Sequence, residues 1–266
     1  MKVGSREYKL LVNHEPFTDP GEAVKAVWDE IEEAARTLPR VRPKGKLDEK
    51  ETRSIIFLDT PDHTLRRNGL VLRQRAVKEA LEHTLKCRSE DRYFAAGTDV
   101  RAADGLEDKP KLEEDIAPPF CCRFSHSVTI TVRKTPKTLC EATRLFPVLG
   151  TLRVDGRRCA PETPLEVVNS IAVDESVWKG GKIVFERDDG AKSEKATVAL
   201  ILWTRGKVER PAVAELSFRI KDSEERFSRS LAEAARSVYT LLLRLDCARR
   251  EGMTKTEYIY RDATQD

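Results

Sequence analysis

Short segments of the chain alternate charged with apolar residues at intervals of two. The charged members of these rows are Glu7 and Lys9, Arg73 and Arg75, Lys86 and Arg88, Glu113 and Asp115, and Glu215, Arg219 and Lys221. Successive side chains of a β-strand point to opposite faces, so each row lies on one face of its strand. Any single row suits an ordinary strand whose charged face meets water. Several rows that mix acids and bases predict instead a barrel with a charged, ion-binding lumen.

Most of the chain outside three helical segments has the pattern of strands separated by turns. Turn signals such as Asn68-Gly69 and Gly180-Gly181 separate the apolar runs. The predicted strands span residues 6–13, 53–58, 70–76, 83–88, 111–116, 127–133, 183–187, 196–204 and 213–221. With the helices, these strands predict an α+β fold.

Three segments have the apolar spacing of amphipathic helices. The first follows Asp19 and Pro20, a cap residue and a favoured first helical residue, and spans about residues 20–38. The second spans about residues 135–147, and the third, with Ser223 as its predicted cap, reaches about residue 245. Amphipathic helices bury one face, so we expect these helices to pack on the outside of the barrel.

The chain is expected to form a single domain over residues 1–266, because no change of composition divides it. The segment at about residues 89–110 is polar and contains glycine, which predicts a long loop or insertion.

The charges of the two signs nearly cancel. The 48 basic and 45 acidic residues give a formal net charge of +3, and acids are interleaved with bases, so nucleic acid is disfavoured as the main partner. The longest apolar run, VALILW, is much shorter than the roughly 20 residues that cross a bilayer, and the first ten residues lack the apolar core of a signal peptide. We therefore expect a cytoplasmic protein that does not enter a membrane.

The six cysteines and four histidines show no pattern of a metal or catalytic site. No C-x-x-C spacing is present, and the histidines are scattered. Reduced thiols in a cytosolic chain explain the cysteines.

A lumen with lysine, arginine and carboxylate side chains has a specific chemical use. The basic groups can hold a polyanion through charge-assisted hydrogen bonds, and the guanidinium fork of arginine suits phosphate oxygens. Acids in the same space would repel such a ligand unless they hold a hard cation, Mg²⁺ or Mn²⁺, that also bridges phosphate oxygens. The alternative is a charged outer face with cross-strand ion pairs, each contributing about 0.2–1 kcal/mol.

These rows resemble the motifs of the CYTH family, also called triphosphate tunnel metalloenzymes. The E-x-E-x-K motif of its first strand falls on Ser5, Glu7 and Lys9, and the segment FLDTPDHTLRRNGLVLRQR (residues 57–75) is the closest match. Later motifs fall on Thr84-Leu85-Lys86, on KLEED (residues 111–115), on AELSFRIK (residues 214–221) and on TKTEY (residues 254–258). The resemblance covers most of residues 5–258, more loosely between residues 153 and 213.

The resemblance implies an eight-stranded antiparallel tunnel with helices outside, which binds a triphosphate and Mg²⁺ or Mn²⁺. It implies that Lys9, Arg73, Arg75, Lys86 and Lys255 contact phosphate, and strand parity adds Arg88 and Arg219. It implies metal ligands at Glu7, Glu113, Asp115 and Glu215, with Lys9 and Glu7 in catalysis. The helix at about residues 20–38 and the loop at about 89–110 are additions to the family core.

The chain departs from the family pattern at two acidic positions. Ser5 replaces the first glutamate, and Ser217 occupies the place of a second acid in the late strand. A serine hydroxyl supplies no negative charge to a Mg²⁺ site. Glu186 or Asp188 of a neighbouring strand could compensate.

The leading hypothesis is a divalent-metal-dependent hydrolase of a triphosphate, either inorganic tripolyphosphate or an organic triphosphate. The family also includes enzymes that act on RNA 5′-triphosphate ends, which is the one expected contact with nucleic acid. Three alternatives stay open: a non-catalytic module that binds polyphosphate or nucleotide, an ATP cyclase, and a plain structural scaffold that binds no ligand. The sequence leaves the oligomeric state open.

Overall fold

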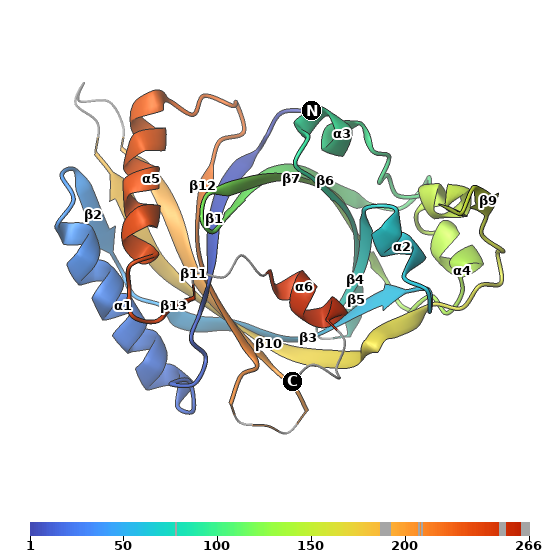
Figure 1. Cartoon of the computed structure of the whole chain (residues 1–266), viewed down its shortest axis with the longest axis horizontal. Helices are drawn as coiled ribbons and strands as arrows, with labels where there is room; N and C mark the ends of the chain where they lie inside the picture. The colour runs from blue at the N-terminus through green and yellow to red at the C-terminus, as the bar shows by residue number, and fades with distance from the viewer. Residues whose placement is uncertain (78, 187–192, 207, 209, 250–253, 262–266) are drawn as a thin grey trace.

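A computed structural model of the chain, which describes residues 1–77, 79–186, 193–206, 208, 210–249 and 254–261, consists of a closed β-barrel with helices around it (Figure 1). Nine strands of the described chain form the closed ring, in the order β11-β12-β1-β6-β7-β5-β4-β3-β10 and back to β11. They are β1 (Ser5–Val12), β3 (Asp48–Asp59), β4 (Leu70–Val77), β5 (Ala80–Ser89), β6 (Asp108–Ala117), β7 (Cys121–Val132), β10 (Glu166–Phe185), β11 (Glu194–Thr204) and β12 (Val213–Lys221).

The ring differs from the predicted barrel in strand number and in one pairing. The resemblance implied eight strands, whereas nine form the ring, the number of strands predicted from the alternation. The predicted strand at residues 183–187 is only the end of the long β10, whose residues 166–182 were not predicted as a strand. β1 and β6 pair in parallel, and the other neighbours in the ring are antiparallel. The parallel pair places Glu7 opposite Asp115 and Ser5 opposite Glu113.

Four short strands of the described residues lie outside the ring. β2 (Val41–Lys44) pairs with β10 and β13 (Ala248–Arg249) pairs with β1. β8 (Arg153–Val154) and β9 (Arg157–Arg158) form a separate two-stranded hairpin.

The helices are α1 (Pro20–Arg36), α2 (Thr64–Arg67), α3 (Arg92–Gly97), α4 (Leu139–Thr143), α5 (Arg229–Leu242), α6 (Lys255–Tyr260) and a 3-10 helix, η1 (Pro147–Thr151). Asp19 caps α1 as predicted, with its carboxylate accepting hydrogen bonds from the first turn. The predicted cap of α5 was wrong: Ser228 rather than Ser223 caps it, so α5 begins later than its apolar spacing indicated. The predicted second helix is broken into α4 and η1, and the predicted loop after Ser89 contains α3 before β6 begins.

The apolar faces of the strands point outward, beneath helices. One core, which includes Tyr8, Leu10, Leu216 and Phe218, lies between the ring and the helices α1 and α5, which lie side by side (Figure 1). A second core lies under α4 and η1 and includes Leu72, Leu85 and Val128. This arrangement leaves the charged rows to face the inside of the ring.

Glycine allows α1 to approach the sheet closely. A Cβ atom on Gly181 of β10 would lie 2.6 Å from the Trp28 ring of α1. The Trp28 indole donates a hydrogen bond to the Gly45 carbonyl at 3.0 Å. The position of the Trp28 ring is therefore fixed both by its packing on Gly181 and by this hydrogen bond.

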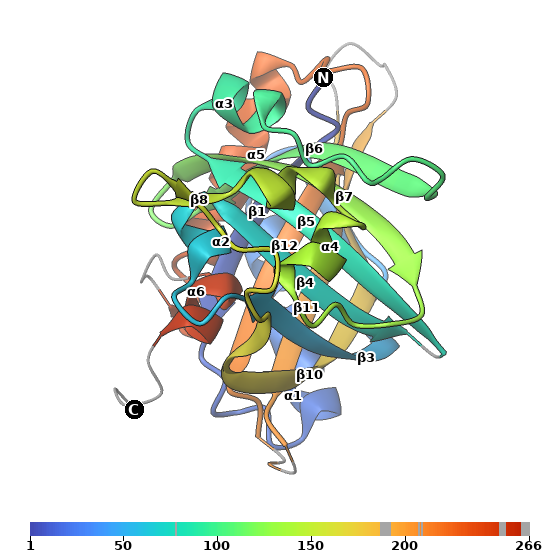
Figure 2. The same ribbon diagram turned by 90° about the vertical axis from the view of Figure 1, so that its right-hand side faces the viewer.

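α6 lies across one end of the barrel (Figures 1 and 2). Its buried Ile259 belongs to a third core with Ile55, Phe57 and Trp203. Asn169 of β10 donates hydrogen bonds from its amide to the carbonyls of Ile259 and Arg261 at 2.9 and 2.8 Å. The contacts hold α6 in place at that end of the ring.

No helix in the described part of the chain combines the length and apolar character needed to cross a bilayer.

Candidate functional site

A cavity of about 400 Å³ lies inside the ring. It is lined by every candidate site residue predicted from the sequence: Glu7, Lys9, Arg73, Arg75, Lys86, Arg88, Glu113, Asp115, Glu215, Arg219 and Lys255. Rows from five strands and one residue of α6 thus meet in one enclosed space. Their individual roles stay predictions.

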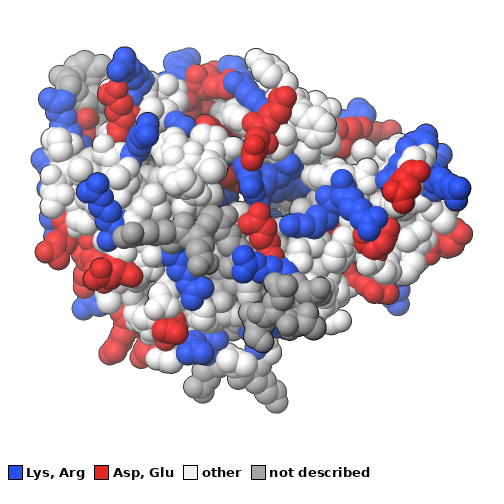
Figure 3. Space-filling view, viewed as in Figure 1, with Lys and Arg blue, Asp and Glu red and all other residues white. Residues whose placement is uncertain are grey.

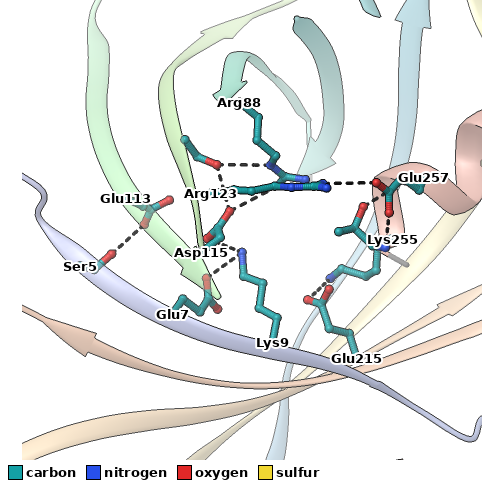
Figure 4. A network of polar contacts seen from close by, with 12 residues as sticks. Ser5, Glu7, Lys9, Arg88, Glu113, Asp115, Arg123, Glu215, Lys255 and Glu257 are labelled. Atoms are coloured by element: carbon teal, nitrogen blue, oxygen red, sulfur yellow. Dashed lines mark hydrogen bonds and ion pairs between the residues drawn. The ribbon is translucent and has the colours of Figure 1, made fainter. Parts of the chain in front are cut away.

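The Lys9 ammonium lies between two carboxylates. Its Nζ atom is 2.7 Å from Asp115 Oδ1 and 3.1 Å from Glu7 Oε2 (Figure 4). Asp115 also accepts a hydrogen bond from the Ser125 hydroxyl at 2.9 Å and lies 3.4 Å from Arg88 Nη2. The parallel pairing of β1 with β6 brings these groups together, because it sets Glu7 opposite Asp115.

The neighbouring charges determine the protonation states of Lys9, Glu7 and Asp115. Burial alone would raise the pKa of Asp115, but Lys9, Lys86 and Arg88 hold it well below its usual range. Burial would likewise raise the pKa of Glu7, and the Lys9 ammonium outweighs that effect and lowers it. Burial would lower the pKa of Lys9, but Asp115 and Glu7 raise it. All three groups are therefore ionised at neutral pH.

The other two predicted acids are also paired. Glu113 accepts a hydrogen bond from the Ser5 hydroxyl at 3.1 Å and lies 3.6 Å from Arg219 Nη1. Glu215 lies 3.1 Å from Lys255 Nζ. Lys255 opens α6, where the side chain of Thr254 and the Glu257 carboxylate form a capping box.

The wall formed by β4 and β5 carries cations with few partners. Lys86 makes no side-chain hydrogen bond or ion pair among the described residues, and the only such contact of Arg73 is a long one, 3.4 Å from Nη2 to Thr84 Oγ1. The Nε atoms of Arg73 and Arg75 are buried without a partner. Burial lowers the pKa of Lys86 to about 8, and burial together with Arg75 lowers that of Arg73. Lys86 and Arg73 thus have few direct polar contacts in the described chain, although the charges of Asp115 and Glu175 act on them and partly offset the effect of burial.

Glu175 is the main lumen residue that the sequence reasoning missed. It is 0 % exposed, and its carboxylate lies 2.6 Å from Arg53, 3.5 Å from Arg75 and 3.8 Å from Lys255. The Trp203 indole donates a hydrogen bond to it at 2.7 Å. Burial would raise the pKa of Glu175, but Lys255, Arg75 and Arg53 lower it strongly.

A sequence signal for Glu175 does exist. Val173, Glu175, Val177 and Lys179 alternate with other residues on β10, in the same way as the predicted rows. The polar residues Asp174 and Ser176 between them obscure the apolar alternation. Two more cavity residues from β3 and β7, Arg53 and Arg123, were likewise not singled out.

A divalent cation needs several oxygen ligands close together, and the described lumen carboxylates are spread over separate ion pairs. Among the residues that the structure describes, no three His, Cys, Asp or Glu side chains come together as a metal cluster. The predicted four-acid metal site is therefore not a single preformed cluster, since Glu113 and Glu215 have their own basic partners. Mg²⁺ is commonly bound by one or two carboxylates plus substrate phosphates, and Glu7 and Asp115 fit that simpler need.

Glu186 does not replace the acids that are missing at Ser5 and Ser217, contrary to the prediction from the sequence. Glu186 lies 3.7 Å from Arg42 and does not line the cavity. Asp188 lies outside the described residues. The two serines themselves are buried, and Ser5 contacts Glu113.

Comparison with known proteins gives only structural matches. No family model and no curated protein matches the chain. A candidate adenylate cyclase from Bacillus halodurans matches with 10% identity, over 97% of this chain and 100% of that one, with a TM-score of 0.44. A candidate adenylyl cyclase from Hippeastrum, described as having a dominant triphosphatase activity, matches with 11% identity, over 97% of this chain and 95% of that one, with a TM-score of 0.44.

A third match is a candidate adenylate cyclase from Vibrio parahaemolyticus, with 12% identity, over 98% of this chain and 100% of that one, and a TM-score of 0.41. The matches extend over nearly the whole chain at low identity. At these values they say nothing about the chemistry of this chain, which depends on its own side chains.

Proposed function

We propose that this protein is a CYTH-type enzyme that binds a triphosphate inside the barrel and hydrolyses it with a divalent cation. The reaction breaks a phosphoanhydride bond: water adds to phosphorus, and the bridging oxygen leaves with its electron pair.

The observation that carries the proposal is that Lys86 and Arg73 line the cavity with almost no direct polar partner in the described chain. Burying a cation without a partner is unfavourable, and the lowered pKa of Lys86, about 8, reflects that cost. An anion bound at this wall would remove the cost. Arginine and lysine directed into one closed space suit the oxygens of a phosphate chain.

The acids of the opposite wall supply the second half of the chemistry. Glu7 and Asp115 are the side chains that would hold Mg²⁺ or Mn²⁺, and such a cation neutralises charge that develops on the transferred phosphoryl group. Lys9 balances the two acids and orients a phosphate oxygen. The ionised Glu7 accepts a hydrogen bond from the attacking water, while Arg73 and Arg75 hold the phosphate chain.

Phosphate release from tripolyphosphate, ATP and thiamine triphosphate, with Mg²⁺ or Mn²⁺, tests the proposal. We expect at least one substrate to be hydrolysed, and Arg73→Gln to lower kcat/KM about 10²–10³-fold, the usual loss for a group that stabilises transition-state charge. The matched control is Arg229→Gln, because Arg229 is 92 % exposed on α5. Turnover of no substrate, or equal rates for the two variants, would contradict enzymatic use of the cavity.

A non-catalytic triphosphate-binding module is a second candidate. Two observations favour it. Each predicted metal-binding acid is paired with a lysine or arginine, and no three His, Cys, Asp or Glu side chains of the described chain form a metal cluster. Calorimetry separates the two candidates. Binding of tripolyphosphate that a chelator does not weaken, together with no phosphate release, indicates the module.

A further inference from the structure

A small hairpin rich in arginine lies at one end of the longest axis of the molecule (Figure 1). It consists of β8 and β9, which are joined by Asp155 and Gly156, and both turn residues have the positive φ, 49° and 78°, of a two-residue Asp-Gly hairpin loop. The register of the hairpin sets Arg153 directly opposite Arg158. Like charges in that position destabilise a strand pair, so this placement does not help the hairpin to fold.

Two arginines of α2 extend the basic surface beside the hairpin. The side chain of Asn68, which follows α2, donates a hydrogen bond to the Arg153 carbonyl at 3.2 Å and so joins the two segments. We call the exposed basic residues of the joined segments the arginine patch: Arg66, Arg67, Arg153, Arg157 and Arg158. Residues 61–68 and 153–158 contain two acids, Asp62 and Asp155, against these five arginines, so the patch is positively charged. Figure 3 shows basic side chains over this end of the molecule.

The charges of the arginine patch are largely available to an external anion. In the described part of the chain, its one ion pair with an acid joins Arg67 to Asp62 at 3.7 Å. The guanidinium groups of Arg153 and Arg158 each donate a hydrogen bond to a backbone carbonyl, at 2.9 and 2.7 Å. These carbonyls orient the two guanidinium groups without neutralising them, and the remaining N–H donors suit phosphate or carboxylate oxygens.

The composition of the arginine patch distinguishes among the partners that such charge could bind. The large apolar side chains that are exposed in the described chain are Met1, Tyr93, Phe94 and Val208, and none of them belongs to the patch. Protein interfaces depend on a buried apolar or aromatic centre, and single-stranded nucleic acid is held by aromatic stacking. The balanced charge of the whole chain disfavours duplex nucleic acid. A surface of anionic lipid headgroups needs only exposed basic groups on a projecting part of the protein.

We propose that the arginine patch binds the anionic headgroups of a lipid surface and docks the protein there without insertion into the bilayer. Its guanidinium groups donate hydrogen bonds to the phosphate and carboxylate oxygens of the lipids. No residue of the patch lines the barrel cavity, so this contact is independent of triphosphate binding. Each arginine near an anionic lipid surface strengthens binding about fivefold.

Sedimentation of the full chain with phosphatidylcholine vesicles, with and without phosphatidylserine, tests the proposal. We expect the wild-type protein to bind the vesicles that contain phosphatidylserine. The patch variant should bind them about a hundredfold more weakly, because it loses three positive charges: Arg153→Gln, Arg157→Gln, Arg158→Gln.

The matched control makes the same charge change on the side of the barrel where α1 and α5 lie (Figure 1). Its three positions have side chains that are 63, 79 and 92 % exposed: Arg36→Gln, Lys46→Gln, Arg229→Gln. We expect the control to bind the vesicles within threefold of the wild-type protein, because these positions lie away from the patch.

Arg157→Glu is a second variant, for use if the thermal transition shows that the patch variant does not fold. The Arg157 side chain makes no hydrogen bond or ion pair with the described residues, so its replacement removes none, and binding should weaken at least tenfold. Equal weakening by the patch variant and the control, or no preference of the wild-type protein for phosphatidylserine, would overturn the inference. Tighter binding of duplex RNA than of vesicles, lost in the same variant, would overturn it in favour of nucleic acid. Failure of phosphate release would leave these results unchanged, so the two proposals are tested separately.

Discussion

The two facing walls of the barrel cavity are both rich in charge, yet they differ in how that charge is balanced. On the wall of β1, β6 and β12, the acids Glu7, Asp115 and Glu113 each meet a basic side chain. On the wall of β4 and β5, Lys86 has no such partner in the described chain, and Arg73 has only a threonine hydroxyl. Arg75 and Arg88 of this second wall do meet the carboxylates of Glu175 and Asp115, so its unpaired part is formed by Lys86 and Arg73. The paired wall is complete by itself, and this unpaired part of the other wall is suited to an anion from solution.

The difference shows that alternation along a strand does not determine what a charge does. Both walls have the same two-residue pattern, and only the strand neighbours distinguish them. A buried ion pair balances its desolvation with its partner, whereas a lone buried cation does not.

Removing the Glu175 carboxylate should cause the largest loss in the free energy of unfolding, because three basic side chains share it as an ion-pair partner. Glu175→Ala leaves Arg53, Arg75 and Lys255 without their shared, fully buried carboxylate, and breaking such a pair costs about 3–5 kcal/mol of unfolding free energy. Glu51→Ala is the control, because Glu51 also pairs with Arg53 but is 34 % exposed, and it should cost less than about 1 kcal/mol. Urea denaturation measures both, and equal losses would show that the Glu175 network contributes little.

Acid should first destabilise the outer face of β5 rather than the lumen. His83 is 0 % exposed with neither ring nitrogen bonded, and burial lowers its pKa to about 4. In the unfolded chain His83 binds a proton near pH 6.5, whereas in the folded chain it stays neutral down to about pH 4. The free energy of unfolding therefore falls as the pH drops from about 6.5 toward 4. The expected loss between pH 7 and pH 5 is about 2 kcal/mol.

The lumen acids behave differently in that range. The pKa values of Asp115 and Glu175 are lowered, so their contribution is present above their ordinary pKa and is lost only in stronger acid. His83→Leu should remove most of the loss between pH 7 and pH 5, as measured by denaturation at both values. An unchanged pH dependence in this variant would mean that the acid sensitivity lies elsewhere.

Affinity of the unpaired wall for an anion should depend on the proton of Lys86. Because the pKa of Lys86 is about 8 in the free protein, most of its charge is gone at pH 9. Tripolyphosphate should bind about tenfold more weakly to the wild-type protein at pH 9 than at pH 7 for this reason. Lys86→Met should lose most of this pH dependence, and calorimetry that finds the same dependence in both proteins would assign it to another group.

The paired wall should accept a cation more readily when Lys9 is removed. Without its ammonium, Glu7 and Asp115 are two adjacent anions, so Lys9→Met should bind Mn²⁺ alone at least threefold more tightly than the wild-type protein. Lys25→Met, on an exposed position of α1, is the control. Titration of Mn²⁺ followed by its paramagnetic resonance signal measures the change, and weaker binding to Lys9→Met would argue against a cation site at these acids.

Much of the barrel was predictable from the two-residue rows, because an alternating row fixes which side chains share a face. The rows of Lys9, Arg75 and Lys86 predicted side chains that do line one cavity. The sequence did not reveal β10 along most of its length, since polar Asp174 and Ser176 interrupt its apolar alternation. Only the end of β10 falls in a predicted strand (residues 183–187), and Glu175 was missed for that reason.

The balance of charge was not predictable, because it depends on which strands are neighbours. The parallel pairing of β1 with β6 sets Glu7 beside Asp115. No local sequence pattern predicts this pairing, because the two strands are far apart in the chain. The position of Lys255 likewise depends on α6, which Asn169 and the core around Ile259 hold across the barrel. The start of α5 was misplaced since both Ser223 and Ser228 are suitable caps and only tertiary packing distinguishes them.

The central claim is that Arg73 of β4 and Lys86 of β5, which have almost no direct polar partner in the described chain, receive a phosphate chain. Calorimetric titration of tripolyphosphate into the wild-type protein and into the double variant Arg73→Gln, Lys86→Met tests it most directly, with Arg229→Gln, Lys25→Met as the control of equal charge change. We predict that the first double variant weakens binding at least a hundredfold and that the control leaves it within twofold. Equal affinity for all three proteins would contradict the claim.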